Sequence, residues 1–263
     1  MTPELAEFAR LAPLGFLVGA YGTLVGAGGG SVLVPALLLL MPYESPATIT
    51  AISLAVVFFN AYSGTIAYMR MGRIEYRTAV LFTLASLPGA VVGVLLVHEL
   101  PRGLFDPLFG GMLLLIGGFL VVNPLGRVAP VHGGARPVGH SRRRSLAGAV
   151  GSSYLAVFAS LLGIGGGIIH VPFLIRVLRF PPHSATATSH FVLTFVALSA
   201  TLTHVAMGEF ARGLSQTMYL AVGVMMGAPL GAALSLKLRG SLIVQMLAVA
   251  LCLVGGRLIW RMF

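Results

Sequence analysis

The sequence predicts an all-α protein that crosses a membrane many times and contains two copies of one helical unit. Apolar residues make up 57% of the chain and charged residues only 9%, whereas about 25% of residues are charged in a typical soluble protein. Charged residues divide the chain into long apolar segments, and the order of these segments repeats once. Together these observations exclude an ordinary soluble domain.

A helix that spans a bilayer needs about 20 apolar residues, within a range of about 17–25. Division of the chain at its charged residues gives eight apolar segments. They are Leu11–Tyr43, Ser45–Met69, Thr78–Val97, Pro107–Asn123, Ser145–Ile175, Ser184–Gly208, Gly213–Leu236 and Gly240–Gly256. The order very long, long, medium and short occurs twice. We therefore predict a first transmembrane repeat at 1–123, a basic inter-repeat loop at 124–146 and a second repeat at 147–263.

The duplication is also visible residue by residue. The motif Gly-x-Gly-Gly-Gly-x4-Pro occurs at Gly26–Pro35 and again at Gly163–Pro172, at an offset of 137 residues. Three further sets of small or polar residues align at nearly the same offset. Thr50–Ser53 aligns with Thr186–Ser189, and Gly89 and Gly93 align with Gly227 and Gly231. The third set, Ser63, Thr65 and Gly72, aligns with Ser199, Thr201 and Gly208. The match is too long and too ordered for chance.

The first segment of each half is too long for one span. About 30 helical residues would reach about 45 Å, beyond a hydrocarbon core of about 30 Å. Each of these segments holds three consecutive glycines, and each glycine costs a helix about 1 kcal/mol relative to alanine. We therefore predict two half-helices that meet at the glycines, as a re-entrant hairpin or as a fully crossing broken helix. We prefer the hairpin, which gives about ten helices and leaves three spans per half, so that the two repeats would be inverted.

The formal charge of +10 comes from basic residues in short gaps between apolar segments. This pattern is typical of loops held on the cytoplasmic side of a membrane, so we expect a multi-pass protein of the cell (inner or plasma) membrane and no nucleic-acid partner. Basic residues divide 12 to 5 between the two faces under either topology, which leaves the side of the termini open. The single cysteine, Cys252, excludes an internal disulfide and a cysteine-based metal site.

All acidic residues lie in loops or at segment edges. They are Glu4, Glu7, Glu44, Glu75, Glu99, Asp106 and Glu209. Carboxylate proton relays and carboxylate cation sites are therefore not expected within the spans, which favours an anion or a neutral solute. The sequence also has no Glu-x-x-His pair, no His-Glu-x-x-His motif and no intramembrane aspartate pair, and its glycine motif resembles a nucleotide-binding loop only loosely. We expect no enzymatic activity and no cofactor.

The glycine motifs are the predicted binding site. Broken backbone at membrane depth is tolerated where it is buried in protein or lines a water-filled cavity. A half-helix that begins after the glycines presents unpaired N–H groups and the positive end of its dipole, which attract anions. The alternative is that the glycines only permit close helix packing.

Polar side chains near the glycines complete the prediction. Serine and threonine hydroxyls donate hydrogen bonds to oxyanions, although in membrane helices they often bond their own backbone. Intramembrane asparagine and histidine are costly and often functional, although a histidine is also found as a packing residue; His170 and His204 rank below His190. The predicted substrate-binding residues are Gly28, Gly29, Gly30, Ser31, Thr50, Ser53, Asn60, Gly165, Gly166, Gly167, Thr188, Ser189 and His190.

The doubled motif at Gly26–Pro35 and Gly163–Pro172 resembles the signature of the sulfite exporter TauE/SafE permeases. Ala185–Ser189 and the Gly-x-x-x-Gly pairs are similar to that family as well. The resemblance implies an inner-membrane permease for small sulfur-containing anions such as sulfite, thiosulfate or the organosulfonate sulfoacetate, bound at the glycine motifs. It leaves open which anion is carried, the direction of transport, coupling to protons and a homodimeric state.

We therefore expect a secondary transporter that moves such an anion by alternating access. Two alternatives remain: a passive anion channel on the same scaffold, and a non-transporting accessory protein of sulfur metabolism in the membrane. Saturable flux with counterflow would exclude the channel, and transport by the purified protein would exclude the accessory role.

Overall fold

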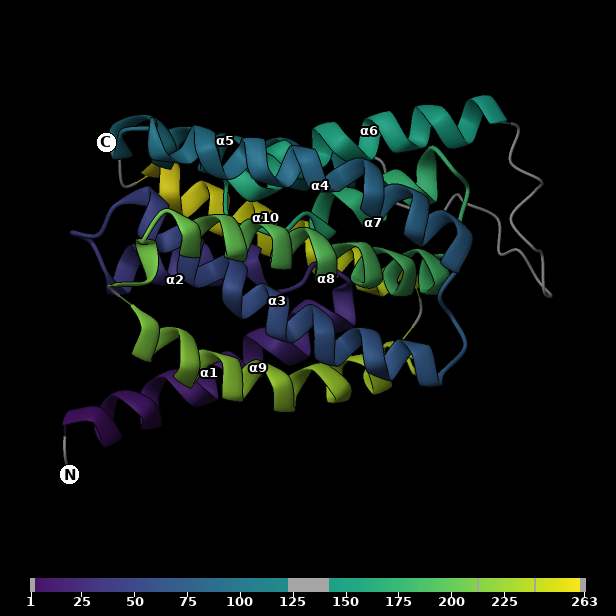
Figure 1. Cartoon of the computed structure of the whole chain (residues 1–263). Coiled ribbons are helices and arrows are strands. Elements are labelled where there is room, and N and C mark those ends of the chain that lie inside the picture. The colour runs from purple at the N-terminus through teal and green to yellow at the C-terminus, as the bar shows by residue number, and fades with distance from the viewer. Residues whose placement is uncertain (1–2, 123–141, 212, 239, 261–263) are drawn as a thin grey trace.

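The computed structural model describes residues 3–122, 142–211, 213–238 and 240–260, which form ten α-helices and a short 3₁₀ helix, η2 (Figure 1). In chain order they are α1 (Pro3–Val25), α2 (Gly30–Leu40), α3 (Pro46–Arg70), α4 (Tyr76–His98), α5 (Arg102–Val122), α6 (Arg142–Leu161), α7 (Gly167–Arg176), α8 (Pro182–Ala206), η2 (Glu209–Ala211), α9 (Leu214–Ser235) and α10 (Gly240–Trp260). The predicted all-α fold is confirmed.

The predicted inter-repeat loop lies outside the described residues up to residue 141. Its last part differs from the prediction, because α6 already begins at Arg142. Similarly, α1 begins at Pro3, well before the first apolar segment. A bilayer has polar interfacial regions on both sides of its hydrocarbon core, so a spanning helix extends past the last apolar residue.

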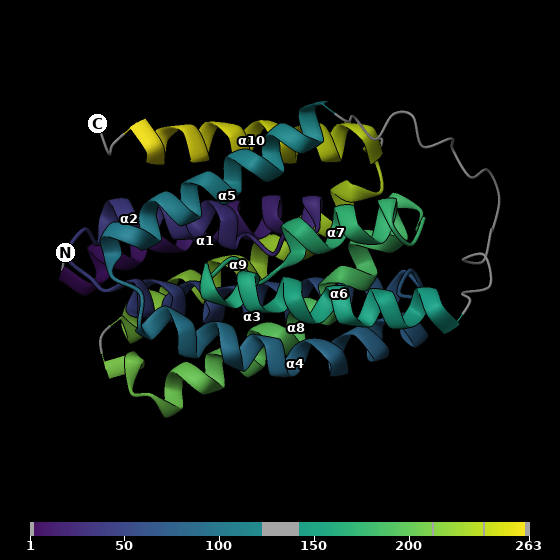
Figure 2. The ribbon, with the colours of Figure 1, turned by 90° about the horizontal axis from the view of Figure 1, so that it is seen from above.

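Each very long apolar segment is broken at its glycines into a long and a short helix. In both views α2 runs back toward the end of the molecule where α1 begins, and α7 runs back toward the end where α6 begins (Figures 1 and 2). This arrangement agrees with the preferred hairpin, which stays a prediction. The 11 residues of α2, at about 1.5 Å each, reach only halfway through a hydrocarbon core of about 30 Å.

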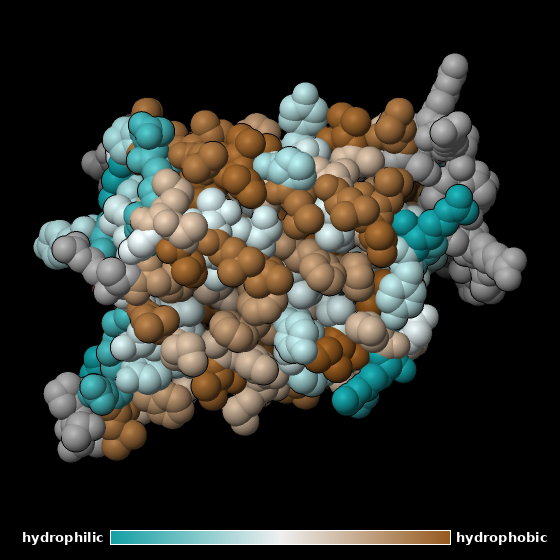
Figure 3. Space-filling model, in the orientation of Figure 1, coloured by the Kyte–Doolittle hydropathy of each residue, from teal (hydrophilic) through white to brown (hydrophobic). Residues whose placement is uncertain are grey.

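The outer surface is that of a membrane protein. Six helices of the described chain are long and apolar enough to cross a membrane: α1, α3, α4, α5, α8 and α9. Apolar side chains cover the middle of the visible face, and hydrophilic ones gather toward its two ends (Figure 3). Large apolar side chains such as Leu84 and Leu115 are 63% and 76% exposed, which is favourable where lipid is the solvent. The chain is a multi-pass membrane protein.

The two halves pack through equivalent contacts. Helix α1 lies along α9 and α6 lies along α4, while α3 packs against α8 and α5 against α10. Helices α3 and α8 are the most buried of the candidate spans. Equivalent helices begin at opposite ends of the molecule, as α1 and α6 show in Figures 1 and 2. The duplicated sequence is thus also a duplicated set of contacts.

Paired glycines allow the closest of these contacts. A Cβ atom on Gly89 or Gly93 of α4 would overlap the backbone of α6, and one on Gly227 or Gly231 of α9 would overlap the backbone of α1. Small residues permit such close approach of membrane helices. These four glycines therefore have a packing role.

Candidate functional site

The two glycine breaks lie against each other in the buried interior, although they are 137 residues apart in the sequence. Gly30 packs against the backbone of residues 163–164, and Gly167 packs against the backbone of residues 26–27. A Cβ atom on either glycine would overlap the opposite break. The structure therefore brings both predicted glycine motifs together, with α2 and α7 beginning where they meet.

Left-handed backbone at the glycines ends one helix and starts the next. The φ angles are 73° and 84° at Gly28 and Gly29, and 73° and 97° at Gly165 and Gly166, a conformation that glycine adopts at little cost. Gly29 and Gly166 are the N-caps of α2 and α7, and neither provides a side-chain cap. The first N–H groups of both helices therefore lack a helical acceptor.

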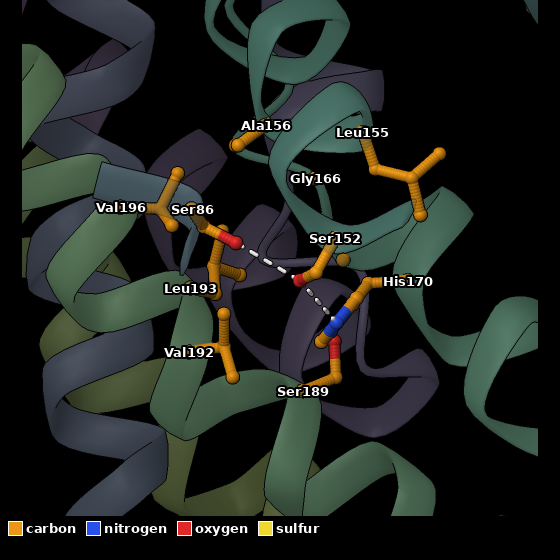
Figure 4. A pocket seen from close by; sticks show the side chains of 12 residues that line it. Ser86, Ser152, Leu155, Ala156, Gly166, His170, Ser189, Val192, Leu193 and Val196 are labelled. Atoms are coloured by element: carbon orange, nitrogen blue, oxygen red, sulfur yellow. Dashed lines mark hydrogen bonds between the residues drawn. The ribbon is translucent and has the colours of Figure 1, made fainter. Parts of the chain in front are cut away.

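A small cavity of about 20 Å³ lies at the second break (Figure 4). One water needs about 10–15 Å³ of such space, so in this conformation the cavity has room for about one water, and a larger solute requires the surrounding helices to move. Residues from α4, α6, α7 and α8 line it: Ser86, Ser152, Leu155, Ala156, Gly165, Gly166, Gly167, His170, Ser189, Val192, Leu193 and Val196. No charged side chain is among them.

Hydrogen bonds connect the polar side chains of the cavity. Ser86 Oγ lies 2.9 Å from Ser152 Oγ, and Ser152 Oγ lies 3.1 Å from His170 Nε2. Ser189 lies beside His170 in Figure 4, is 0% exposed and has no hydrogen-bond partner for its hydroxyl among the described residues. An unpaired buried polar group costs about 1–3 kcal/mol, so a bound ligand with an acceptor atom would be stabilised there.

The lining of the cavity could hold an anion through hydrogen bonds and the dipole of a helix, without a fixed positive charge. Serine hydroxyls and the His170 ring supply hydrogen-bond donors, and α7 directs the positive end of its dipole at the glycines. With no carboxylate in the lining, an anion meets no like charge. With no lysine or arginine in the lining either, dipoles alone would balance the anion's charge.

Two apolar side chains separate the cavity from the first break. Val57 of α3 and Leu193 of α8 lie 136 residues apart, so they are repeat equivalents. Both side chains lie where a Cβ atom on Gly28 or Gly165 would be, and together with two alanines they form a buried apolar cluster. The predicted residues Gly28, Gly29, Gly30 and Ser31 are buried at the first break and do not line the cavity.

The predicted hydroxyl residues have different surroundings. Ser53 donates to the backbone carbonyl of Gly163 in the second break, with an O···O distance of 2.7 Å. Thr50 donates to carbonyls of its own helix at 2.9 and 3.0 Å, which is the alternative considered for it. The Thr188 hydroxyl accepts the N–H of Glu75 at 3.1 Å. Of the hydroxyl residues named from the sequence, Ser189 alone lines the cavity.

The predicted residues Asn60 and His190 lie together, but in a second polar cluster that does not line the cavity. Thr23 Oγ1 donates to Asn60 Oδ1 at 3.0 Å, and His190 Nε2 lies 3.4 Å from Thr23 Oγ1. Tyr68 donates its hydroxyl hydrogen to the Thr23 carbonyl at 2.8 Å. All four side chains are at most 1% exposed.

Sequence reasoning missed Ser86 and Ser152 and ranked His170 low. A signal for two of them was present in the repeat itself. His170 occupies the motif position of Leu33 in the first half, and Ser152 occupies that of Gly15. Where one repeat has a polar residue and the equivalent position of the other repeat has an apolar residue or glycine, the two repeats have diverged.

Comparison with known proteins gives a consistent result. The profile of the family described as sulfite exporter TauE/SafE matches residues 11–258. The chain is 29% identical over 271 residues to the probable membrane transporter protein YunE of Bacillus subtilis strain 168, covering 97% of this chain and 98% of the relative. A probable membrane transporter protein of Xylella fastidiosa strain Temecula1 is 28% identical, with 94% and 93% covered. No solved structure matches. The chain therefore belongs to the sulfite exporter TauE/SafE family of membrane proteins.

Proposed function

We propose that this protein is a secondary transporter for a small sulfur-containing anion, such as sulfite, thiosulfate or an organosulfonate like sulfoacetate, and that the anion binds at the second glycine break. The observation that carries the proposal is the cavity at Gly165–Gly167, with its Ser86–Ser152–His170 chain and the unpaired Ser189 hydroxyl. Family membership supports the transporter class.

The cavity chemistry favours an oxyanion. Sulfite and sulfonate groups carry their negative charge on several oxygen atoms, and each oxygen accepts hydrogen bonds. Hydroxyls from α4, α6 and α8 and the N-terminus of α7 converge on one small space. Binding by dipoles without a fixed cation is expected to be reversible, because hydrogen bonds to charged groups contribute only about 1.5–3 kcal/mol each. A transporter needs such reversibility to release its substrate.

Alternating access follows from the duplicated architecture. Equivalent helices begin at opposite ends of the molecule (Figures 1 and 2), which supports the predicted inverted repeats. Substrate sites of such transporters lie near the bilayer midplane, where the repeats meet at broken helices. Val57 and Leu193 fill the space between the two breaks, which favours a carrier that must rearrange over an open channel.

Ligand-induced stabilisation of the purified protein tests the binding site. A ligand that binds only the folded state stabilises it by RT ln(1 + [L]/Kd), about 2.7 kcal/mol at 100 times Kd. Sulfite, thiosulfate or sulfoacetate should raise the unfolding temperature, whereas acetate and chloride should not. The Ser152→Ala variant should lose this response, and Thr50→Val, whose hydroxyl bonds its own helix, should keep it.

Flux in proteoliposomes tests transport itself. Counterflow of the stabilising anion, with saturation, is expected of a carrier. Linear flux without counterflow would favour the passive channel, and the absence of flux in protein that binds the anion would favour the accessory role. Equal stabilisation of the wild type and Ser152→Ala by every anion would contradict the placement at the second break.

A further inference from the structure

We propose that His190 is a separate proton-binding site, and that the proton it takes up is transported together with the anion. This inference rests on the proposed function, because it assigns the coupling ion of the same transporter. The bound species is H⁺, and the group that takes it is Nδ1 of the imidazole. Neither His190 nor its polar contacts line the anion cavity.

His190 lies at a four-helix junction in the interior. It belongs to α8 and is 0% exposed. Thr23 of α1 contacts its Nε2 atom, and Tyr68 of α3 packs edge-on against its ring at a centroid distance of 5.5 Å. The Tyr68 hydroxyl also lies 3.4 Å from Ser235 Oγ of α9. Helices of both repeats therefore meet at this imidazole, so a rearrangement of one repeat against the other changes its surroundings.

The hydrogen bonds determine which ring nitrogen is free. Thr23 uses its hydroxyl hydrogen toward Asn60 Oδ1, so its oxygen is left to accept from His190 Nε2. In the neutral ring the hydrogen is therefore on Nε2, and Nδ1 holds a lone pair. Nδ1 is buried and has no hydrogen-bond partner in the neutral ring, and the protonated ring can donate to the backbone carbonyl of Thr186, one turn earlier on α8. That atom is a vacant proton acceptor at membrane depth, where ionisable groups often belong to ion pathways.

The groups around His190 leave a protonated ring without a counter-charge of its own. Tyr68 is the titratable side chain in ring contact with it, and the Tyr68 hydroxyl donates to the Thr23 carbonyl. Helices α1 and α9 present the hydroxyls of Thr23 and Ser235. No carboxylate contacts the ring in the described part of the chain. An imidazolium here is therefore unfavourable unless an anion is bound nearby.

The anion cavity supplies that charge. Ser189, the neighbour of His190 on α8, lines the cavity with its unpaired hydroxyl. Opposite charges attract strongly where little water separates them, so a bound anion favours the protonated ring and a protonated ring favours the anion. This reciprocity couples the two binding events. The proton enters Nδ1 from one side of the membrane and leaves to the other side with the anion.

Proton uptake by the wild-type protein gives a test that needs no variant. Calorimetric titration with the stabilising anion, in buffers of different ionisation enthalpy, measures the protons bound with each anion. We expect uptake of up to about one proton per anion, as linkage requires of a coupled site. Anion binding with no proton uptake would overturn the proposal while leaving the anion site standing.

Substitution then assigns the proton to a residue. The amide of His190→Gln retains a donor for Thr23 but takes up no proton. This variant should lose accumulation driven by a pH gradient by at least about tenfold and should retain anion counterflow, which needs no net proton movement. His204→Gln is the matched control, because His204 is also 0% exposed, on the same helix and without a hydrogen-bond partner in the described structure; it should behave like the wild type.

Three results would have different meanings. Retained pH-driven accumulation in His190→Gln, or its loss in His204→Gln alone, would overturn the assignment to His190. Counterflow in the wild type without any effect of the pH gradient would overturn proton coupling and leave the transporter intact. Absence of wild-type counterflow would instead contradict the proposed function.

Discussion

The two glycine breaks share one backbone and differ in their surroundings. Both contain left-handed glycines at equivalent positions, and both are followed by a short helix that starts at the last glycine. The polar residues of the cavity occur at the second break only. Their repeat equivalents at the first break are apolar residues or glycine: Leu33 for His170, Gly15 for Ser152 and Val224 for Ser86.

Ser53 and Ser189 are the same residue at equivalent positions of the two repeats, yet their contacts differ. Ser53 donates to the Gly163 carbonyl, whereas Ser189 has no partner and lines the cavity. One serine stabilises the backbone of the opposite break, and the other is available to a ligand. The comparison indicates that one scaffold was duplicated and that the side chains at its two breaks then diverged.

The largest loss of stability is expected from substitutions at the glycines that the two breaks share. Gly30→Ala and Gly167→Ala each place a Cβ atom into the backbone of the opposite break. Overpacking usually costs about 1–3 kcal/mol, and a clash between backbones should reach the upper end. Both variants should lower the unfolding midpoint to a similar extent in chemical denaturation. Tolerance of either substitution would contradict the close contact of the breaks.

Exchange of one divergent residue tests the difference directly. His170→Leu gives the second break the side chain of the first and removes the ring that bonds Ser152. Loss of a hydrogen bond to a charged ligand, about 1.5–3 kcal/mol, should weaken anion binding by about 10- to 150-fold in a calorimetric titration.

The reverse exchange serves as its control. Leu33→His buries a polar ring at a position that is 0% exposed, so it should lower stability without creating a second site. Tighter or additional anion binding by this variant would show that the two breaks are interchangeable.

Substitution of the two equivalent serines should have different effects on anion affinity and on the stability of the fold. Ser53→Ala leaves a buried carbonyl unpaired and should lower the free energy of unfolding by about 1–3 kcal/mol, with little change in anion affinity. Ser189→Ala removes a hydroxyl that has no partner in the unliganded protein, so it should cost little stability and weaken binding. Denaturation and anion-binding measurements on both variants check this. Equal effects of the two substitutions would contradict the different roles of Ser53 and Ser189.

The smallest effect is expected at Thr50. Its hydroxyl bonds carbonyls of its own helix, and valine has nearly the same shape. Thr50→Val should therefore change the free energy of unfolding by less than about 1 kcal/mol, since those carbonyls remain in the helical ladder. Anion-induced stabilisation should be unchanged. A loss of binding would place Thr50 in the site after all.

Much of the fold could be predicted from the sequence because the patterns that indicate helices and their ends lie within short segments. Apolar length identifies spanning helices, and three consecutive glycines mark the end of a helix. The repeat motif also located the meeting point of the hairpins, since a duplicated motif occupies equivalent positions. Helix ends were less predictable, as Arg142 at the start of α6 shows, because hydropathy follows the hydrocarbon core and helices continue into the interface.

The site was harder to predict because it depends on which side of a helix faces which neighbour. Ser189 and His190 are adjacent in the sequence, yet Ser189 lines the cavity and His190 contacts Thr23 of α1. Successive residues of a helix point in directions about 100° apart, so proximity in sequence does not place them in one site. Ser86 and Ser152 are 66 residues apart, and only the packing of α4 on α6 brings them together.

The sequence by itself determined the all-helical membrane fold, the duplication and the glycine breaks, because apolar length, periodicity and backbone freedom are properties of short segments. The tertiary structure alone decided that the polar cavity lies at one break, that Val57 and Leu193 separate it from the other, and that Asn60 and His190 belong to a second cluster. These features arise from contacts between helices that are distant in the chain, and such contacts leave no pattern within any one helix.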